Sequence, residues 1–201
     1  MIKNIILDVG MVLVDFCWED LFKQLGITGE AFEAVADATV RTQDWNEYDR
    51  SAKQDEEILR GFIANAPDYR QQIQLFWDHM SGMIQQYPYA ESWMKSLKES
   101  GYDVYILSNY ARRTYELTKE DGLSFLSLAD GAVFSFETGH IKPEKEIYHV
   151  IMDKYTLQPK ECVFIDDNAA NLVYPKELGW STIQFHNIAQ VKEELHVLGV
   201  Q

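Results

Sequence analysis

The chain has 201 residues, of which 46% are hydrophobic and 25% charged, a composition typical of a globular protein with one buried core or a core carrying a small insert. Its formal net charge of -14 argues against nucleic acid and anionic membranes as partners, because both attract Lys and Arg. No apolar run reaches bilayer-spanning length, and the apolar start lacks the basic front of a signal peptide, so we expect a cytoplasmic protein.

Short apolar runs rich in β-branched residues predict strands of a parallel sheet that is buried on both faces. In chain order these strands span residues 5–14, 104–107, 132–134 and 162–165, with 181–185 as a candidate fifth strand. Helical patterns between them span residues 90–100, 145–155 and 170–178. This alternation predicts the α/β class, with a Rossmann-like three-layer core.

Residues 16–87 break the alternation, because they are rich in helix formers with apolar residues three or four apart, such as Ile58 and Phe62. We therefore expect a core domain of residues 1–15 and 88–201 and an inserted helical cap of residues 16–87. In open α/β sheets, ligands bind beyond the carboxyl ends of the strands. A cap inserted after the first strand would roof such a site.

Most other features of the insert are interpreted as structural. The acidic stretch 49–57 reads as a solvated helix face. The aromatic residues are interpreted mainly as cap core, with Trp18 and Trp45 as candidates for contact with a ligand. Cys17 and Cys162 lie far apart in apolar settings, which indicates core thiols and no disulfide.

Polar residues follow the first two predicted strands of the core. Asp8 ends the apolar segment 4–7, and it needs a cation or strong hydrogen-bond donors nearby because desolvating an unpaired carboxylate is costly. Gly10 permits a tight turn and exposes its backbone carbonyl, a hard oxygen suited to magnesium. Ser108 and Asn109 follow the next strand, where a hydroxyl and backbone amides can hold a phosphate oxygen.

Two further charged positions complete the pattern. Lys142 precedes Pro143 and a predicted helix, with the proline in the favoured first turn, so the lysine supplies a positive charge just outside that helix. Asp166 and Asp167 end the strand 162–165, and two adjacent carboxylates repel each other without a cation. Taken alone, each of these residues is better explained as a turn or surface residue than as a functional one. Together they occur in the order that phosphoryl transfer from a monoester requires.

With these motifs the chain resembles the haloacid dehalogenase (HAD) superfamily over nearly its whole length. The four motifs of that superfamily match residues 8–12, Ser108, Lys142 and the pair Asp166 and Asp167. The segments 139–144 and 165–168 are similar to the small-cap branch, which includes sugar-phosphate phosphatases such as those acting on α-D-glucose 1-phosphate. The resemblance implies a magnesium-dependent hydrolase of a small phosphorylated metabolite, with a hexose 1-phosphate as the first substrate candidate.

The resemblance also implies a role for each motif residue. Asp8 would be the nucleophile that becomes phosphorylated. The residues expected to bind the phosphoryl group are Ser108, Asn109 and Lys142. The expected Mg²⁺ ligands are Asp8, the Gly10 carbonyl, Asp167 directly and Asp166 through water, with Asn171 as the outer-shell partner of Asp167.

One position departs from the superfamily pattern. Its phosphatases usually carry an Asp two residues after the nucleophile, as the acid for the leaving group, but Gly10 stands there in this chain. Some sugar phosphatases of the branch share this glycine. Asp15, a cap residue or water would then supply the proton. His140 is a candidate for contact with the substrate.

Two other functions stay open at this point. A dehalogenase of 2-halo acids would use the same Asp8 but needs no metal and typically lacks the acidic pair. A catalytically weak regulatory module would bind a phosphorylated ligand without turnover.

Overall fold

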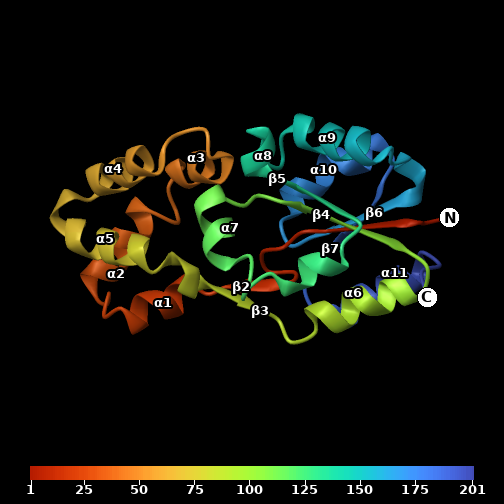
Figure 1. The fold of residues 1–201 in the computed structure, drawn as a ribbon, viewed down its shortest axis with the longest axis horizontal. Coiled ribbons are helices and arrows are strands. Elements are labelled where there is room, and N and C mark those ends of the chain that lie inside the picture. Colours follow the sequence, from red (N-terminus) through yellow and green to blue (C-terminus); the bar gives the residue numbers. More distant parts are fainter.

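A five-stranded parallel sheet forms the centre of the computed structural model, which describes residues 1–201 (Figure 1). The strand order is β5-β4-β1-β6-β7, so β1 lies in the middle with β4 and β6 on either side. The strands are β1 Asn4–Leu7, β4 Asp103–Ser108, β5 Gly131–Phe134, β6 Cys162–Asp166 and β7 Ser181–Gln184. The predicted α/β class with a parallel sheet is confirmed, including the candidate fifth strand.

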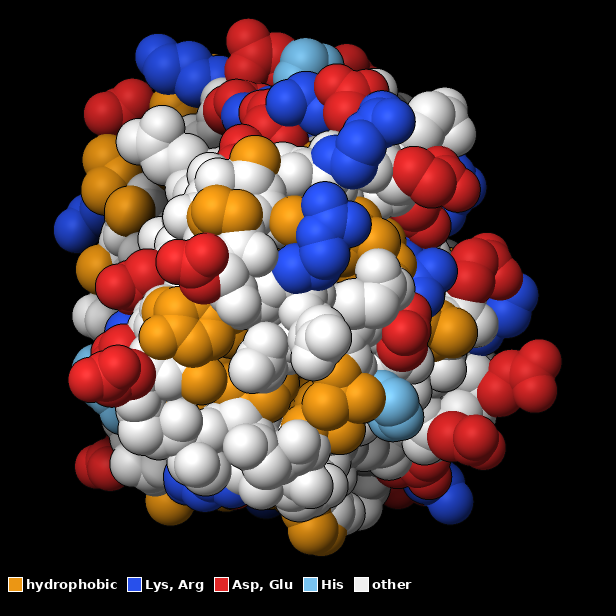
Figure 2. Space-filling model, turned by 90° about the vertical axis from the view of Figure 1, so that its left-hand side faces the viewer, with side chains coloured by type: hydrophobic (Ala, Val, Ile, Leu, Met, Phe, Trp, Pro, Cys, Tyr) orange, Lys and Arg blue, Asp and Glu red, His pale blue; other side chains and the backbone are white.

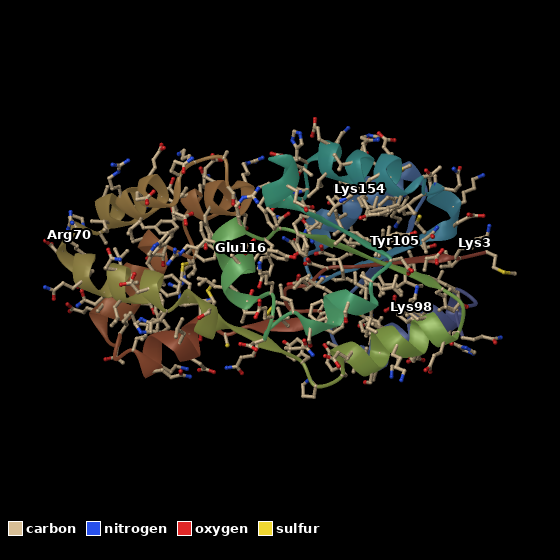
Figure 3. The ribbon with its side chains drawn as sticks, in the orientation of Figure 1. Lys3, Arg70, Lys98, Tyr105, Glu116 and Lys154 are labelled. Carbon is tan, nitrogen blue, oxygen red and sulfur yellow. The ribbon has the colours of Figure 1, made fainter.

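Helices cover both faces of the sheet, because successive strand residues point to opposite sides. Ile5 and Leu7 pack with α6 (Ala90–Glu99) and α11 (Ile188–Val197) on one face. Ile6, between them, packs with α9 (Lys145–Tyr155) and α10 (Ala169–Leu178) on the other. Figure 3 shows this layering, with Lys98 on α6 and Lys154 on α9 on opposite sides of the sheet.

The apolar run 5–14 is not one strand, and that prediction was wrong. The chain leaves the sheet after Leu7 and turns, with the N–H groups of Leu13 and Val14 both donating to the Val9 carbonyl at 2.8 and 3.0 Å. It then forms β2 (Val14–Phe16), which pairs antiparallel with β3 (Ile84–Gln86) in a separate two-stranded sheet. The apolar residues of the turn are buried in the core, so hydrophobicity alone did not reveal it.

The segment between β2 and β3 is helical and has its own apolar cluster, in which Phe22, Phe62 and Phe76 are fully buried. Its helices are α1 Trp18–Gln24, α2 Glu30–Ala38, α3 Asp44–Arg50, α4 Asp55–Asn65 and α5 Arg70–Asp78. Figure 2 shows the end of the molecule built from these helices, where charged side chains gather toward the rim. The limits 16–87 for a cap domain stay a prediction, which the separate apolar cluster supports.

Short elements connect the larger ones. They are the helices α7 Arg112–Thr118 and α8 Ser135–Thr138 and the 3₁₀ turns Pro67–Tyr69, Met80–Met83, Ser124–Leu128 and Pro159–Glu161. Pro143 lies just before Glu144, the N-cap of α9, and so stands outside the first turn in which we expected it.

Cys162 is buried and Cys17 partly exposed, and both thiols are free. No helix of the structure is both long and apolar enough to cross a bilayer.

Two glycines give a matched test of this packing. A Cβ built on Gly131 of β5 would lie 2.2 Å from the Tyr155 ring, whose hydroxyl is bonded to both the N–H (2.8 Å) and the carbonyl (3.0 Å) of Ala132. We expect Gly131→Ala to lower the free energy of unfolding by about 1–3 kcal/mol, because the ring cannot move without losing these bonds. Urea unfolding measures the change.

Gly61→Ala is the control, since its Cβ would make only ordinary contact, 3.7 Å from an Asp44 oxygen. Gly61 lies inside α4, where alanine gains roughly 0.5–1 kcal/mol over glycine. Equal stability of the two variants would contradict the packing described for β5.

Candidate active site

The polar residues of the predicted site meet at the carboxyl ends of three neighbouring strands. Asp8 follows β1, Ser108 ends β4 and Asp166 ends β6. Because β4, β1 and β6 are adjacent and parallel, their ends lie at the same edge of the sheet. Lys142 reaches this edge from the loop between α8 and α9.

The ammonium group of Lys142 joins the strand ends. Its Nζ lies 2.8 Å from Asp8 Oδ1 and 2.7 Å from Asp166 Oδ2, and it donates to the Leu107 carbonyl at 3.0 Å. The lysine side chain is 1% exposed. Burial by itself lowers the pKa of Lys142, but Asp166 and Asp8 outweigh burial and raise it, so the group stays charged.

The two carboxylates of the acidic pair have different surroundings. Asp166 is fully buried, and its oxygens accept from the Asn168 N–H at 2.8 Å and from the Asn171 amide at 3.0 and 3.1 Å, besides Lys142. Asp167 is half-buried and faces a cavity. Asn171 therefore holds Asp166 and not Asp167, which we expected it to support.

Three carboxylates crowd together at this place. Oxygens of Asp8, Asp166 and Asp167 all lie within 4.8 Å of one another. Burial raises the pKa of Asp8 to about 7, with Lys142 opposing and Asp166 and Asp167 adding to the rise. Burial and Asp166 also raise the pKa of Asp167. One lysine offsets only part of this negative charge, so the cluster suits a hard divalent cation.

The loop after Asp8 adds one more oxygen ligand. No hydrogen bond within the chain ends on the Gly10 carbonyl, and Gly10 lines the same cavity as Asp8 and Asp167. Met11 follows with a left-handed backbone, φ +58°, and its N–H donates to the Val14 carbonyl at 2.7 Å. Carboxylate and carbonyl oxygens together are the donor set that Mg²⁺ prefers in proteins.

Ser108 and Asn109 lie beside this cluster. The Ser108 hydroxyl is buried and makes only a long contact, 3.4 Å, with the Asn109 carbonyl. The Asn109 side chain is occupied by Lys142, because its amide donates to the Lys142 carbonyl at 3.0 Å and its Oδ1 accepts from the Lys142 N–H at 2.7 Å. The Asn109 N–H has no partner in the chain, so it is the group that remains for a ligand.

A cavity of about 180 Å³ opens above these residues, between the sheet edge and the insert. Asp8, Gly10, Asn109 and Asp167 line its polar side, whereas Ser108, Lys142 and Asp166 are buried behind it. The rest of the wall is largely apolar, with Met11, Phe16, Trp45, Met83, Ile84 and Tyr110 among its members. No Lys, Arg or His side chain lines it.

The cavity also contains a residue whose role the sequence reasoning missed. Asp49 of α3 lines it, so the interpretation of 49–57 as a solvated face was wrong at its first residue. The available signal was spacing: Trp45, a ligand candidate, stands four residues before Asp49 and so shares its helix face. Trp45 does line the cavity, whereas Trp18, His140 and Asp15 do not.

Comparisons with known proteins bear on this site. A protein-family model described as "haloacid dehalogenase-like hydrolase" matches residues 2–179. D-ribitol-5-phosphate phosphatase of Bacteroides thetaiotaomicron is 26% identical over 219 aligned positions, which cover 98% of each chain. Mouse bifunctional epoxide hydrolase 2 is 31% identical over 144 positions, covering 69% of this chain, which spans about a quarter (26%) of that protein.

Solved structures share the fold. A HAD-like family hydrolase from Porphyromonas gingivalis has a TM-score of 0.75 at 23% identity, over 97% of this chain and 98% of that one. A HAD family enzyme from Bacteroides thetaiotaomicron, in complex with magnesium and inorganic phosphate, has a TM-score of 0.72 at 22% identity, over 95% and 99%. A dehalogenase has a TM-score of 0.71 at 18% identity, over 93% and 86%.

Removing the buried ammonium tests the central ion bridge. We expect Lys142→Met to lower the free energy of unfolding by about 3–5 kcal/mol at pH 7, because Asp8 and Asp166 stay buried without their cation. The deficit should shrink as the pH falls and Asp8, whose pKa burial raises, binds a proton. Unfolding in urea at several pH values measures both effects.

The exposed Lys160 lies in a 3₁₀ turn outside any ion pair and provides the control. Lys160→Met should change stability by less than about 0.5 kcal/mol. Similar losses of unfolding free energy in the two variants would show that the ion pairs of Lys142 stabilise the protein no more than an exposed lysine does.

Asp49 gives a second test, with an effect of opposite sign. Burial, and then the charge of Asp8, raise the pKa of Asp49 to about 8 in the folded chain. An acid whose folded pKa is raised destabilises the fold as the pH rises from its ordinary value, 3.8, to that folded pKa. Asp49→Asn should therefore raise the Tm of the metal-free protein above pH 8, by about 2 °C or more, and leave it nearly unchanged at pH 4.

Scanning calorimetry of Asp49→Asn beside the exposed Asp68→Asn separates this effect from a general loss of negative charge. A gain that is equal at both pH values, or equal in both variants, would contradict the position of Asp49 in the cavity wall.

Proposed function

Because the chain belongs to the haloacid dehalogenase-like hydrolases, we propose that it is a magnesium-dependent phosphatase of a small phosphorylated metabolite, with Asp8 as its nucleophile. The observation that carries the proposal is the arrangement of three carboxylates around one buried lysine. Three negative charges and one positive charge leave a net charge of -2, which a divalent cation would balance. With the cation bound, the site would have no net negative charge that repels a phosphate dianion.

The donor set fits magnesium. Asp8, Asp167 and the Gly10 carbonyl would hold the ion, with Asp166, whose oxygens are already occupied, outside the direct ligands. Bound there, Mg²⁺ would supply charge stabilisation for the phosphoryl group and the attacking carboxylate. The relative solved with magnesium and inorganic phosphate supports this assignment.

The residues of the chain would divide the remaining work. An Asp8 oxygen would attack phosphorus as the bond from phosphorus to the leaving oxygen breaks, which forms an aspartyl-phosphate and releases the alcohol. Water would then hydrolyse the aspartyl-phosphate to inorganic phosphate and free Asp8. The Lys142 ammonium, the Ser108 hydroxyl and the Asn109 N–H would hold the phosphoryl oxygens, since preorganised donors stabilise the charge that develops in transfer. Asp166 and Asn109 would keep Lys142 in place through their bonds to it.

The substrate class follows from the cavity. Its small volume and its lack of basic side chains favour one phosphate on a compact, uncharged group. Aromatic walls such as Trp45 suit the apolar faces of a polyol or sugar. We propose a sugar or sugar-alcohol monophosphate, a class to which the substrate named for the ribitol-phosphatase relative belongs, with hexose 1-phosphates as further candidates.

A phosphate-release assay tests the proposal. The panel consists of ribitol 5-phosphate, glucose 1-phosphate, glycerol 3-phosphate and p-nitrophenyl phosphate, each with Mg²⁺ or with EDTA. We expect Mg²⁺-dependent release that Asp8→Asn lowers about 10⁴-fold or more, because the nucleophile is lost at nearly constant shape.

Asp103→Asn is the control, as an exposed aspartate at the opposite end of the sheet, and it should keep the wild-type rate. Activity that survives EDTA or Asp8→Asn would refute the mechanism. Halide release from 2-chloropropionate would indicate a dehalogenase, and phosphate binding without turnover would indicate a regulatory module.

A further inference from the structure

Asp49 has the position of a residue that acts on the ligand. It lies in the last turn of α3, in the insert, yet it lines the cavity together with Asp8 and Gly10 from the core. The charge of Asp8 raises the pKa of Asp49 and that of Lys142 lowers it, so these side chains lie within electrostatic reach of one another around the cavity. Asp49 is therefore a part of the insert that faces the reacting residues.

The core holds this turn of the insert in place. The Asp49 carbonyl accepts from the Ser135 hydroxyl at 2.7 Å, and Arg50 forms a bidentate pair with Glu144. Ser51 accepts from the Arg112 N–H at 2.9 Å. These bonds attach Asp49 and the two residues after it to the core, which holds the end of α3 in place beside the cavity.

The Asp49 carboxyl has no partner of its own. No hydrogen bond or ion pair within the chain involves its oxygens, although its own carbonyl and the neighbouring Arg50 side chain are both bonded. The Asp49 side chain is only partly exposed, and a carboxyl that is withdrawn from water without a cation favours the protonated form, so the pKa of Asp49 rises to about 8. A carboxyl that keeps its proton near neutral pH is able to donate it.

The usual source of that proton is absent here. Gly10, two residues after Asp8, has no side chain, and a Cβ built on it would meet no atom within 4 Å. Other proton donors in the wall are occupied, since the Tyr110 hydroxyl is bonded to Thr118 at 2.9 Å and the Thr114 hydroxyl to Tyr48 at 2.7 Å. The cavity thus has free space at Gly10, where the usual acid is missing, and Asp49 is the one acid in its wall that is assigned neither as nucleophile nor as metal ligand.

We propose that Asp49 is the catalytic acid and base of this site, an inference that rests on the phosphatase activity proposed above. As an Asp8 oxygen bonds to phosphorus and the bond from phosphorus to the leaving oxygen breaks, the Asp49 carboxyl gives its proton to that oxygen, which departs as an alcohol. The Asp49 carboxylate then takes a proton from the water that attacks phosphorus. The bond from Asp8 to phosphorus breaks, and inorganic phosphate, the Asp8 carboxylate and protonated Asp49 result.

Leaving-group dependence tests this role. An alkoxide needs a proton to leave, whereas p-nitrophenolate does not. We expect Asp49→Asn to lower kcat with glycerol 3-phosphate by about 10²- to 10⁴-fold, the usual contribution of a general acid. With p-nitrophenyl phosphate the loss in the phosphorylation step, measured in single turnovers, should stay under about tenfold.

A second variant asks whether an acid in the usual place restores the rate. Because the space at Gly10 is open, the double variant Gly10→Asp with Asp49→Asn should hydrolyse glycerol 3-phosphate at least about tenfold faster than Asp49→Asn alone. The wild-type rate should also fall as the pH rises through the pKa of Asp49, a limb that Asp49→Asn lacks. The charged groups that face Asp49 in this titration are Asp8, Asp167 and Lys142.

The exposed Asp68→Asn should match the wild type throughout. Equal losses with both esters in single turnovers, or no loss with either, would overturn the role of Asp49 while leaving the phosphatase proposal intact. A wild-type protein that releases phosphate from neither ester would instead overturn the proposed function, and the role of Asp49 with it.

Discussion

The buried ammonium of Lys142 between two carboxylates is the interaction on which the site depends. Asp8 and Asp166 end neighbouring strands, and with Asp167 beside them they would repel one another if nothing positive lay between. Burial makes that repulsion stronger, because little water screens it. The lysine therefore must be held accurately, and the Asn109 side chain does so by donating to the Lys142 carbonyl and accepting from the Lys142 N–H.

This constraint also explains the different exposure of the acidic residues. The Asp166 oxygens accept hydrogen bonds from Lys142, Asn168 and Asn171, so this carboxylate positions the lysine. Asp167, one residue later, points to the cavity and remains open to a ligand. Asp166 is the last residue of β6 and Asp167 lies just beyond the strand, so the two carboxylates have different surroundings although their oxygens lie within 4.8 Å of each other.

The insert contributes in a different way from the core. Most of its apolar residues pack in one cluster, and hydrogen bonds with Ser135, Arg112 and Glu144 attach the end of α3 to the part of the chain that forms the sheet. The wall of the cavity is consequently built from both parts. A largely apolar wall strengthens the electrostatic effect of the few charges that line it.

Several features could be predicted from the sequence by itself. The sheet strands and three of the four helices that flank the sheet, α6, α9 and α10, follow from local apolar periodicity. The order of Asp8, Ser108, Lys142 and the acidic pair indicated one shared site, because parallel strands bring their carboxyl ends together. Tertiary structure alone decided the rest. The turn within 5–14 is buried and so has the hydrophobicity of a strand, and the place of Asp49 depends on how α3 packs on the core, which no local pattern records.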